Sequence, residues 1–488
     1  MATFCFSLLI LFLGYKIYGT FLDKKFGPDN RTTPAITKKD GVDFVPMPTW
    51  KVFLIQLLNI AGLGPIFGAI TGALWGPIVC LWIVLGTIFA GAVHDYLSGM
   101  LSERNGGISI AEIVGKYLGN VIKQVMRVFS IILLMMVGVV FMVGPAELIA
   151  LLTPNTFDVQ FWTIVILLYY GISTFLPIDK LVSKVYPVFG FSLLMMAFLI
   201  GGITIFNHIS GTAKMPELWD YFGNMHHNKI PIFPMMFVSV ACGAISGFHA
   251  TQSPMMARCI KSEKEGKKVF YGAMCMESVI ALIWAYASST FFYDPTTNGW
   301  LAEKVVNISD KKEIIKFIGN SAGVYGMSMS LLGIVGGVFA ILGVIVCPIT
   351  SGDASFRSVR FAIADLFKIN QKNLFKRFIL TFLILSIGYA ISLFDYSVIW
   401  RYFSWSNQTL AMIVLWSGAV YLSKNKGKYI GLIAGIPASF MSSVSLSYIL
   451  QAKEGFAINH FLSNIIGICV AFILFSIFFF KICLKNKK

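Results

Sequence analysis

The chain carries few charged residues for its length. Asp, Glu, Lys and Arg make up only 13% of its 488 residues, whereas 57% are hydrophobic and the mean hydropathy is +0.76. Soluble domains carry about 25% charged residues. The apolar residues gather into runs of about 20, the length that crosses a bilayer as a helix. The composition excludes an ordinary soluble domain and predicts an all-α polytopic membrane protein.

Several motifs are also missing. The eight cysteines lie mostly inside apolar runs and form no Cys-x-x-Cys pair, so neither a disulfide framework nor a zinc site is indicated. There is no Gly-x-x-x-x-Gly-Lys-Ser/Thr loop and no His-Glu-x-x-His motif. ATP-driven transport within this chain and common intramembrane metalloprotease chemistry therefore lose support, and no cofactor or metal is predicted.

The apolar runs predict about 13 transmembrane helices. The first run, Phe4 to Leu22, lacks a basic n-region and a small-residue cleavage site, so we expect it to be retained as a span. The expected spans are 4–22, 50–73, 75–100, 128–150, 160–177, 185–206, 231–257, 269–291, 326–348, 375–393, 398–422, 430–450 and 460–482.

The basic residues predict the orientation of these spans. The net charge is +16, with 39 Lys and Arg. Counted with the adjoining span ends, the odd connections and the C-terminal tail hold 30 of them and the even connections hold 7, while Lys16 and Arg401 lie within spans. The positive-inside rule then places the N-terminus outside and the C-terminus in the cytoplasm. The basic loops are explained by topology and anionic lipid, so no nucleic-acid partner is predicted.

Two of the spans contain helix-breaking residues. The second carries Ala61 to Pro65, and the seventh carries Gly243 to Pro254. Unpaired backbone at membrane depth survives only where it faces protein or water. The two spans are five apart and opposite in direction, which is typical of a five-plus-five inverted repeat. We therefore expect an extra N-terminal span within 1–49, repeats over 50–206 and 231–422, and two more spans within 430–488.

The breaks supply the candidate substrate-binding residues. At the first, Gly62, Gly64 and Pro65 expose backbone groups; the alternative is close helix packing, helped by Gly68 and Gly72. At the second, polar side chains add hydrogen-bonding groups: Ser246, His249, Thr251 and Gln252, with Asn407 in the eleventh span. A substrate carboxylate is expected to meet the half-helix N-termini at Gly64 to Phe67 and Ala250 to Gln252.

Ionisable side chains inside spans are the candidates for ion coupling. His94 and Asp95 could form a proton relay, although adjacent helical residues point about 100° apart; the alternative is a pair that caps or bridges cytoplasmic helix ends. Glu277 is either a buried proton acceptor or a structural partner of a neighbouring polar group. Thr350, Ser351 and Asp353 offer oxygens for a cation or a proton; the alternative is a cap on a cytoplasmic helix from Ala354 to Phe367.

Five sequence blocks resemble the carbon starvation protein A (CstA) family. They are Asn59 to Gly68, Ala90 to Tyr96, Ser102 to Gly107, Ala241 to Pro254 and Pro348 to Asp353. The resemblance implies a bacterial inner-membrane transporter, induced on nutrient depletion, that takes up peptides or pyruvate by proton symport and has a LeuT-like fold. In that fold the helix carrying Thr350 and Ser351 contributes hydroxyls to a sodium site. Longer relatives carry a His-His pair where this chain has Ile55-Gln56, and they extend further at the C-terminus.

The leading hypothesis is a secondary transporter for a small peptide or pyruvate-like carboxylate. One alternative is a membrane sensor that binds the same nutrient and signals to a cytoplasmic partner. Another is an intramembrane enzyme that uses His94, Asp95, His249 and Glu277 around a metal. Neither the oligomeric state nor the choice between proton and sodium follows from the sequence.

Overall fold

The computed structural model describes residues 1–41, 44–173, 178–226, 228–293, 321–369 and 373–484, without the side chains of 178–187, 322 and 365. Over these residues every regular element is helical. The elements are α1 (Ala2–Leu13), η1 (Gly14–Tyr18), α2 (Gly19–Phe26), α3 (Pro34–Thr37), α4 (Thr49–Ile60), α5 (Gly64–Gly72), η2 (Ala73–Trp75), α6 (Val79–Gly86), η3 (Thr87–Gly91), α7 (Ala92–Arg104), α8 (Ile110–Leu118), α9 (Asn120–Leu152), α10 (Val159–Ser173), α11 (Ile178–Ile209), η4 (Ile232–Met236), α12 (Phe237–Ser239), α13 (Ala241–Ala244), α14 (Gly247–Ala257), η5 (Glu263–Glu265), η6 (Lys267–Tyr271), α15 (Gly272–Tyr293), α18 (Ser321–Leu366), α19 (Leu374–Ser392), α20 (Tyr396–Asn425), α21 (Leu432–Gln451), α22 (His460–Phe478) and η7 (Phe479–Leu484).

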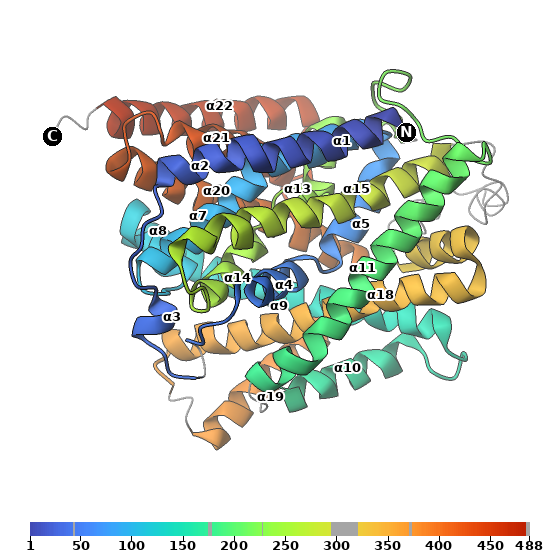
Figure 1. Ribbon diagram of the computed structural model, residues 1–488, viewed down its shortest axis with the longest axis horizontal. Coiled ribbons are helices and arrows are strands. Elements are labelled where there is room, and N and C mark those ends of the chain that lie inside the picture. The colour runs from blue at the N-terminus through green and yellow to red at the C-terminus, as the bar shows by residue number, and fades with distance from the viewer. Residues whose placement is uncertain (42–43, 174–177, 227, 294–320, 370–372, 485–488) are drawn as a thin grey trace.

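Each predicted span coincides with a helix or a broken helix, and the long helices run side by side (Figure 1). Within the described ranges, 9 helices are long and apolar enough to cross a membrane, or up to 10 with the bent pair α4 and α5. Three predicted spans fall outside this set: α10, the broken seventh span and the polar α20. The predicted end of α10 at 174–177 lies outside the described residues. The membrane-protein class is confirmed, and the count of 13 stays a prediction.

Both predicted helix breaks are present. The first separates α4 from α5, which are bent by 49°. At the second, Ile245 and Ser246 are extended, with ψ of 135° and 127°, and α14 begins at Gly247. This break is shorter than expected, because Ala250 to Gln252 lie inside α14. The predicted half-helix N-terminus at those residues is wrong; it lies at Gly247 to His249.

Helix α18 is longer than the predicted ninth span. It has 46 residues, interrupted at Gly333, whose φ of 66° and ψ of −173° are non-helical. From there it continues through Pro348 and the Thr350 to Asp353 segment as far as Leu366. The alternative in which this segment caps a separate cytoplasmic helix is therefore wrong.

The helix contacts are reciprocal between the two halves of the chain. Helix α5, the second part of the broken second span, packs against α15, the helix that follows the seventh span. Helix α14, the second part of the broken seventh span, packs against α7, which belongs to the span after the second. Helices α9 and α18 pack against each other. Helix α10 contacts α18 as α19 contacts α9, and α11 contacts α18 as α20 contacts α9. In Figure 1, α10, α18 and α19 lie on one side of the molecule and α1, α21 and α22 on the opposite side, while α11 crosses the view diagonally.

Candidate functional site

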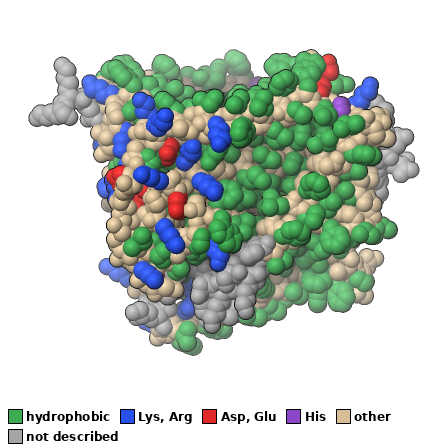
Figure 2. Space-filling view, in the orientation of Figure 1, with side chains coloured by type: hydrophobic (Ala, Val, Ile, Leu, Met, Phe, Trp, Pro, Cys, Tyr) green, Lys and Arg blue, Asp and Glu red, His purple; other side chains and the backbone are tan. Residues whose placement is uncertain are grey.

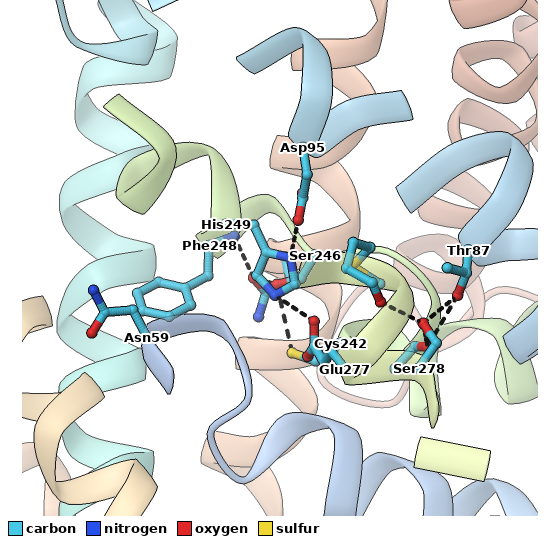
Figure 3. A network of polar contacts seen from close by, with 12 residues as sticks. Asn59, Thr87, Asp95, Cys242, Ser246, Phe248, His249, Glu277 and Ser278 are labelled. Carbon is cyan, nitrogen blue, oxygen red and sulfur yellow. Dashed lines mark hydrogen bonds and ion pairs between the residues drawn. The ribbon is translucent and has the colours of Figure 1, made fainter. Parts of the chain in front are cut away.

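Four buried ionisable side chains form a row beside the second break. His94 Nδ1 lies 2.8 Å from Asp95 Oδ1, and His249 Nδ1 lies 2.9 Å from Asp95 Oδ2. On the other edge of its ring, His249 Nε2 lies 3.4 Å from Glu277 Oε2. All four side chains are 0% exposed. Figure 3 shows the ring of His249 between the two carboxylates. Helices α7, α14 and α15 thus meet at this buried ionisable row.

Local backbone geometry brings α7 close to the break. The π-helical turn η3 precedes α7, and such turns shift the register of a helix and are frequent at functional sites. A Cβ on Gly91 would lie 2.1 Å from the carbonyl oxygen of Ala244, so only glycine permits this approach. The carbonyl of Gly243 accepts hydrogen bonds from Ser278 at 3.1 Å and Thr87 at 3.4 Å. These hydroxyls, 2.6 Å apart, partner a carbonyl next to the break.

The structure places the side chains of His94 and Asp95 against each other. They are buried beside the break and not at a cytoplasmic helix end. The alternative of a pair at cytoplasmic helix ends is wrong, because the second partner of Asp95 is His249 of α14; the proton relay stays a prediction. Spacing along α7 could not reveal that partner.

The row can hold a proton in two positions. An ionised Asp95 accepts an N–H from each imidazole, which leaves Nε2 of His249 facing Glu277. One proton can then sit on Glu277 as a carboxylic acid or on His249 as an imidazolium. Over the described residues, neither Glu277 oxygen has a hydrogen-bond partner. An uncompensated charge is costly at membrane depth. A proton on Glu277 leaves both groups neutral, and a proton on His249 gives a pair of opposite charges, so this pair is suited to bind and release a proton.

Two buried amides near the row have unused hydrogen-bonding capacity. Within the described part of the chain, Oε1 of Gln56 and Oε1 of Gln252 have no partner. Gln56 Nε2 lies 3.4 Å from Ser253 Oγ, which places this α4 side chain against α14. Unsatisfied buried groups are costly, so a ligand or water is expected to bind there. In the sequence, Gln56 stands out only because longer relatives have a His-His pair where this chain has Ile55-Gln56.

The other polar candidates of the second break bond within the protein. Asn407 Oδ1 accepts from the Phe248 amide at 2.9 Å and from Ser246 Oγ at 3.0 Å. It therefore caps the N-terminus of α14 from α20. Thr251 Oγ1 donates to the carbonyl of Phe248 at 2.7 Å. These residues position the break, and their polar groups are already engaged.

The glycines of the first break serve close packing as well as the break itself. A Cβ on Gly64 would lie 2.2 Å from Cys242 Cβ, and one on Gly62 would lie 2.7 Å from the ring of Phe141. A Cβ on Gly68 would lie 2.9 Å from the carbonyl of Ser239. Pro65 lies in the first turn of α5, where its missing N–H is tolerated. The close-packing interpretation is therefore confirmed, and a role of this segment in substrate binding stays a prediction.

An aromatic set links the two half-helices, and the sequence analysis missed it. Its ring-centroid distances are 5.6 Å for Phe67 and Trp400, 5.3 Å for Trp400 and Phe403, 5.9 Å for Phe403 and Phe141, and 6.1 Å for Phe141 and Phe248. With 43 phenylalanines in the chain, no sequence signal distinguishes these rings from packing or lipid-facing ones.

Thr350, Ser351 and Asp353 do not form a single group. Ser351 Oγ lies 3.3 Å and 3.1 Å from the carbonyls of Leu58 and Asn59, at the end of α4. Thr350 Oγ1 donates to its own helix at the carbonyl of Cys347, 2.7 Å away. Ser351 thus lies at the first break, whereas Asp353 faces elsewhere.

Asp353 already has a counter-ion. Its Oδ2 lies 3.1 Å from Nη2 of Arg357, and its Oδ1 accepts a hydrogen bond from Ser173 of α10. Among the described residues, no group of three or more His, Cys, Asp and Glu side chains has a metal-binding arrangement.

Sequence and structure comparisons agree with one another. The family model described as "Carbon starvation protein CstA" matches residues 1–150, 146–293 and 318–448. An "Uncharacterized membrane protein" of Haemophilus influenzae is 41% identical over 60% of this chain and 92% of its own length. The Bacillus subtilis "Peptide transporter CstA" is 27% identical over 89% of this chain and 87% of its own length.

One further sequence relative and one solved structure have more specific names. The Escherichia coli "Pyruvate/proton symporter BtsT" is 26% identical over 58% of this chain and 48% of its own length. A crystal structure of the Eremococcus coleocola manganese transporter matches with a TM-score of 0.53 and 10% identity, over 91% of this chain and 98% of that one. The second likeness concerns the fold alone.

Proposed function

Because this chain belongs to the carbon starvation protein CstA family, we propose that it imports a small nutrient, a peptide or a pyruvate-like carboxylate, by proton symport. It is a multi-pass membrane protein of a transporter family and not an enzyme. The proposal places it in the bacterial inner membrane, acting in the response to carbon starvation.

The buried ionisable row is the observation that carries proton coupling. Its members come from three helices, and one of these, α14, is half of a broken span. A change in the position of α14 alters the contact of His249 with Asp95 and Glu277 together. Proton binding and the movement of α14 are therefore linked, because the proton on the row changes the strength of the contacts that hold α14 in this position.

The substrate is proposed to bind between the two breaks. A carboxylate is favoured near the N-termini of α5 and α14, where the helix dipoles are positive. The unused amide oxygens of Gln56 and Gln252 add hydrogen-bond acceptors, and the aromatic set encloses apolar parts of the substrate. Asn407 and Ser246 hold the break in shape.

The fold is proposed to be a LeuT-like five-plus-five inverted repeat over 50–206 and 231–422. The reciprocal contacts of α5 with α15, and of α14 with α7, support it, since a two-fold relation exchanges such pairs. We expect access to alternate as the second and seventh spans rock against the other repeat helices. Figure 2 shows Lys and Arg gathered at the C-terminal end of the molecule, which supports a cytoplasmic C-terminus and an external N-terminus.

Uptake by proteoliposomes tests the proposal. Labelled pyruvate and a labelled dipeptide are offered while proton and sodium gradients are imposed separately. We expect one substrate to accumulate only with an inward proton gradient. Glu277→Gln, which mimics the protonated acid, is expected to keep exchange of substrate across the membrane and to lose proton-driven accumulation. Glu112→Gln, in a cytoplasmic ion pair with Lys123 and Arg127, is the matched control and is expected to behave as the wild type.

Other outcomes would contradict the proposal. Accumulation driven by sodium alone would shift coupling to Thr350, Ser351 and the carbonyls of Leu58 and Asn59. Saturable binding without accumulation under either gradient would favour the nutrient sensor.

A further inference from the structure

A stripe of charged residues runs along the half of α18 that follows Pro348. Asp353, Arg357 and Arg360 are spaced i, i+4 and i+7, so they share one face of the helix. Nη2 of Arg357 donates to the carbonyl of Ser173 in α10. The stripe therefore faces α10, and α19 contacts both α10 and α18.

Among the residues that the structure describes, Arg360 is a buried cation with no ion pair of its own. It is only 2% exposed, and within the described residues its Nε and Nη1 have no hydrogen-bond acceptor. Arg357 and Arg377 are close enough for their charges to act on it, and so is Asp353. Asp353, however, is already paired with Arg357. A guanidinium buried among like charges is unfavourable unless an anion is bound beside it.

The chemistry of the free atoms indicates the type of anion. The planar, permanently charged guanidinium carries N–H donors that suit the oxygens of a phosphate or carboxylate. Arg377, at the start of α19, adds a second positive charge. The guanidinium of Arg360 also lies 4.7 Å from the ring centroid of Phe361, which holds it in place.

We propose that Arg360 and Arg377 bind the phosphate of an anionic phospholipid from the inner leaflet. Exposed aromatic residues beside the two arginines favour a lipid over a free ion. Phe361, whose ring lies against the guanidinium of Arg360, is 42% exposed, and Phe378, next to Arg377 in the chain, is 53% exposed, so both can contact acyl chains. In the proposed orientation this end of α18 and α19 is cytoplasmic, where anionic headgroups and basic pockets between helices meet.

Lipid-dependent stability of the full chain in nanodiscs tests the proposal. The wild type, Arg360→Gln and the control Lys481→Gln, which removes an exposed charge from η7, are compared in phosphatidylcholine and in phosphatidylglycerol. We expect phosphatidylglycerol to raise the unfolding temperature of the wild type and of Lys481→Gln. Arg360→Gln is expected to bind phosphatidylglycerol about tenfold more weakly. In phosphatidylcholine the same variant is expected to be at least as stable as the wild type, because an unpaired buried charge has been removed.

The outcomes are distinguishable. An equal response to phosphatidylglycerol in the wild type and Arg360→Gln would overturn the proposal. If inorganic phosphate at millimolar concentration produces the same shift, the site binds free anions and the lipid assignment is wrong. If Arg360→Gln does not fold, Arg360→Lys keeps the charge but loses the planar fork; unchanged retention of phosphatidylglycerol in native mass spectrometry would then overturn it.

Discussion

The two helix breaks occupy corresponding places in the chain but are built differently. The first, between α4 and α5, has Ala61, Gly62 and Leu63 at its centre and is packed against the seventh span through Gly64. The second, at Ile245 and Ser246, is capped by Asn407 and bordered by the buried ionisable row. One break provides close backbone approach, and the other concentrates groups that can carry a proton. We infer that the two breaks have divided these tasks, although the row at the second break draws His94 and Asp95 from the first repeat.

The strongest expected difference concerns Asp95, which serves only the second break. Asp95→Ala removes the common acceptor of two buried imidazoles, and we expect it to destabilise the protein by about 3–5 kcal/mol. Unfolding by SDS in mixed micelles measures the effect. Asp95→Asn keeps the shape and one acceptor and is expected to lose less. Equal stability of Asp95→Ala and the wild type would show that the row is not coupled to the fold.

At the first break, we expect protein stability to depend on close glycine contacts and not on charged side chains. Gly64→Ala forces a Cβ against Cys242, so we expect a loss of about 1–3 kcal/mol. Cys242→Gly in the same chain should restore most of that loss, since it removes the opposing atom. Gly202→Ala is the matched control, because no atom lies within 4 Å of its added Cβ. Failure of the double variant to recover would place the strain elsewhere.

Among the described residues, the cap on α14 has no counterpart at the start of α5, where the N-cap residue Leu63 provides no side-chain hydrogen bond. Asn407→Ala is expected to cost about 0.5–2 kcal/mol and to slow transport, because the amide of Phe248 loses its acceptor. Thermal unfolding and uptake are measured together. Asn373→Ala, which uncaps the exposed start of α19, should lower stability without slowing transport. The same transport defect in both variants would mean that capping in general, not this break, matters.

Ser351 is the side chain that supports the carbonyls of the first break. Ser351→Ala is expected to cost about 1 kcal/mol, because the carbonyls of Leu58 and Asn59 lose a donor. Ser355→Ala, whose hydroxyl donates only within its own helix at 2.7 Å, is the control and should change stability less. If the two variants have the same unfolding free energy, the contact with α4 adds nothing to stability.

The ion pair of Glu112 with Lys123 and Arg127 lies outside the predicted spans. Its loss is expected to have the smallest effect on stability, which makes it a reference for the buried ionisable row. Burial opposes ionisation of Glu112, but Lys123 and Arg127 outweigh it and lower the pKa of this carboxyl. Its stabilisation is therefore present above the ordinary pKa of glutamate and is lost as the pH falls below it. Glu112→Gln should cost no more than about 1 kcal/mol at pH 7 and nothing in acid. A pH-independent cost would show that packing, not charge, is responsible.

Much of the fold could be predicted from local sequence. Apolar runs set the helices, and Gly62, Gly64 and Pro65 marked the first break, because these properties depend on neighbouring residues alone. The extent of the second break could not be predicted so well: Ala250 to Gln252 are helical because Asn407, more than 150 positions away, caps α14 at Gly247. The course of α18 through Pro348 was missed, because a proline in a helical pattern usually ends or kinks the helix.

The candidate site was likewise predictable only in part from the sequence. The sequence by itself identified His94, Asp95, His249 and Glu277 as ionisable groups at membrane depth, because their cost in an apolar run is visible without a partner. Only the tertiary structure decided that they form one row, that Asp353 is paired with Arg357, and that Gln56 lies against α14. Sequence specifies which side chains are costly to bury; packing of distant helices decides which of them meet, because that depends on contacts between segments far apart in the chain.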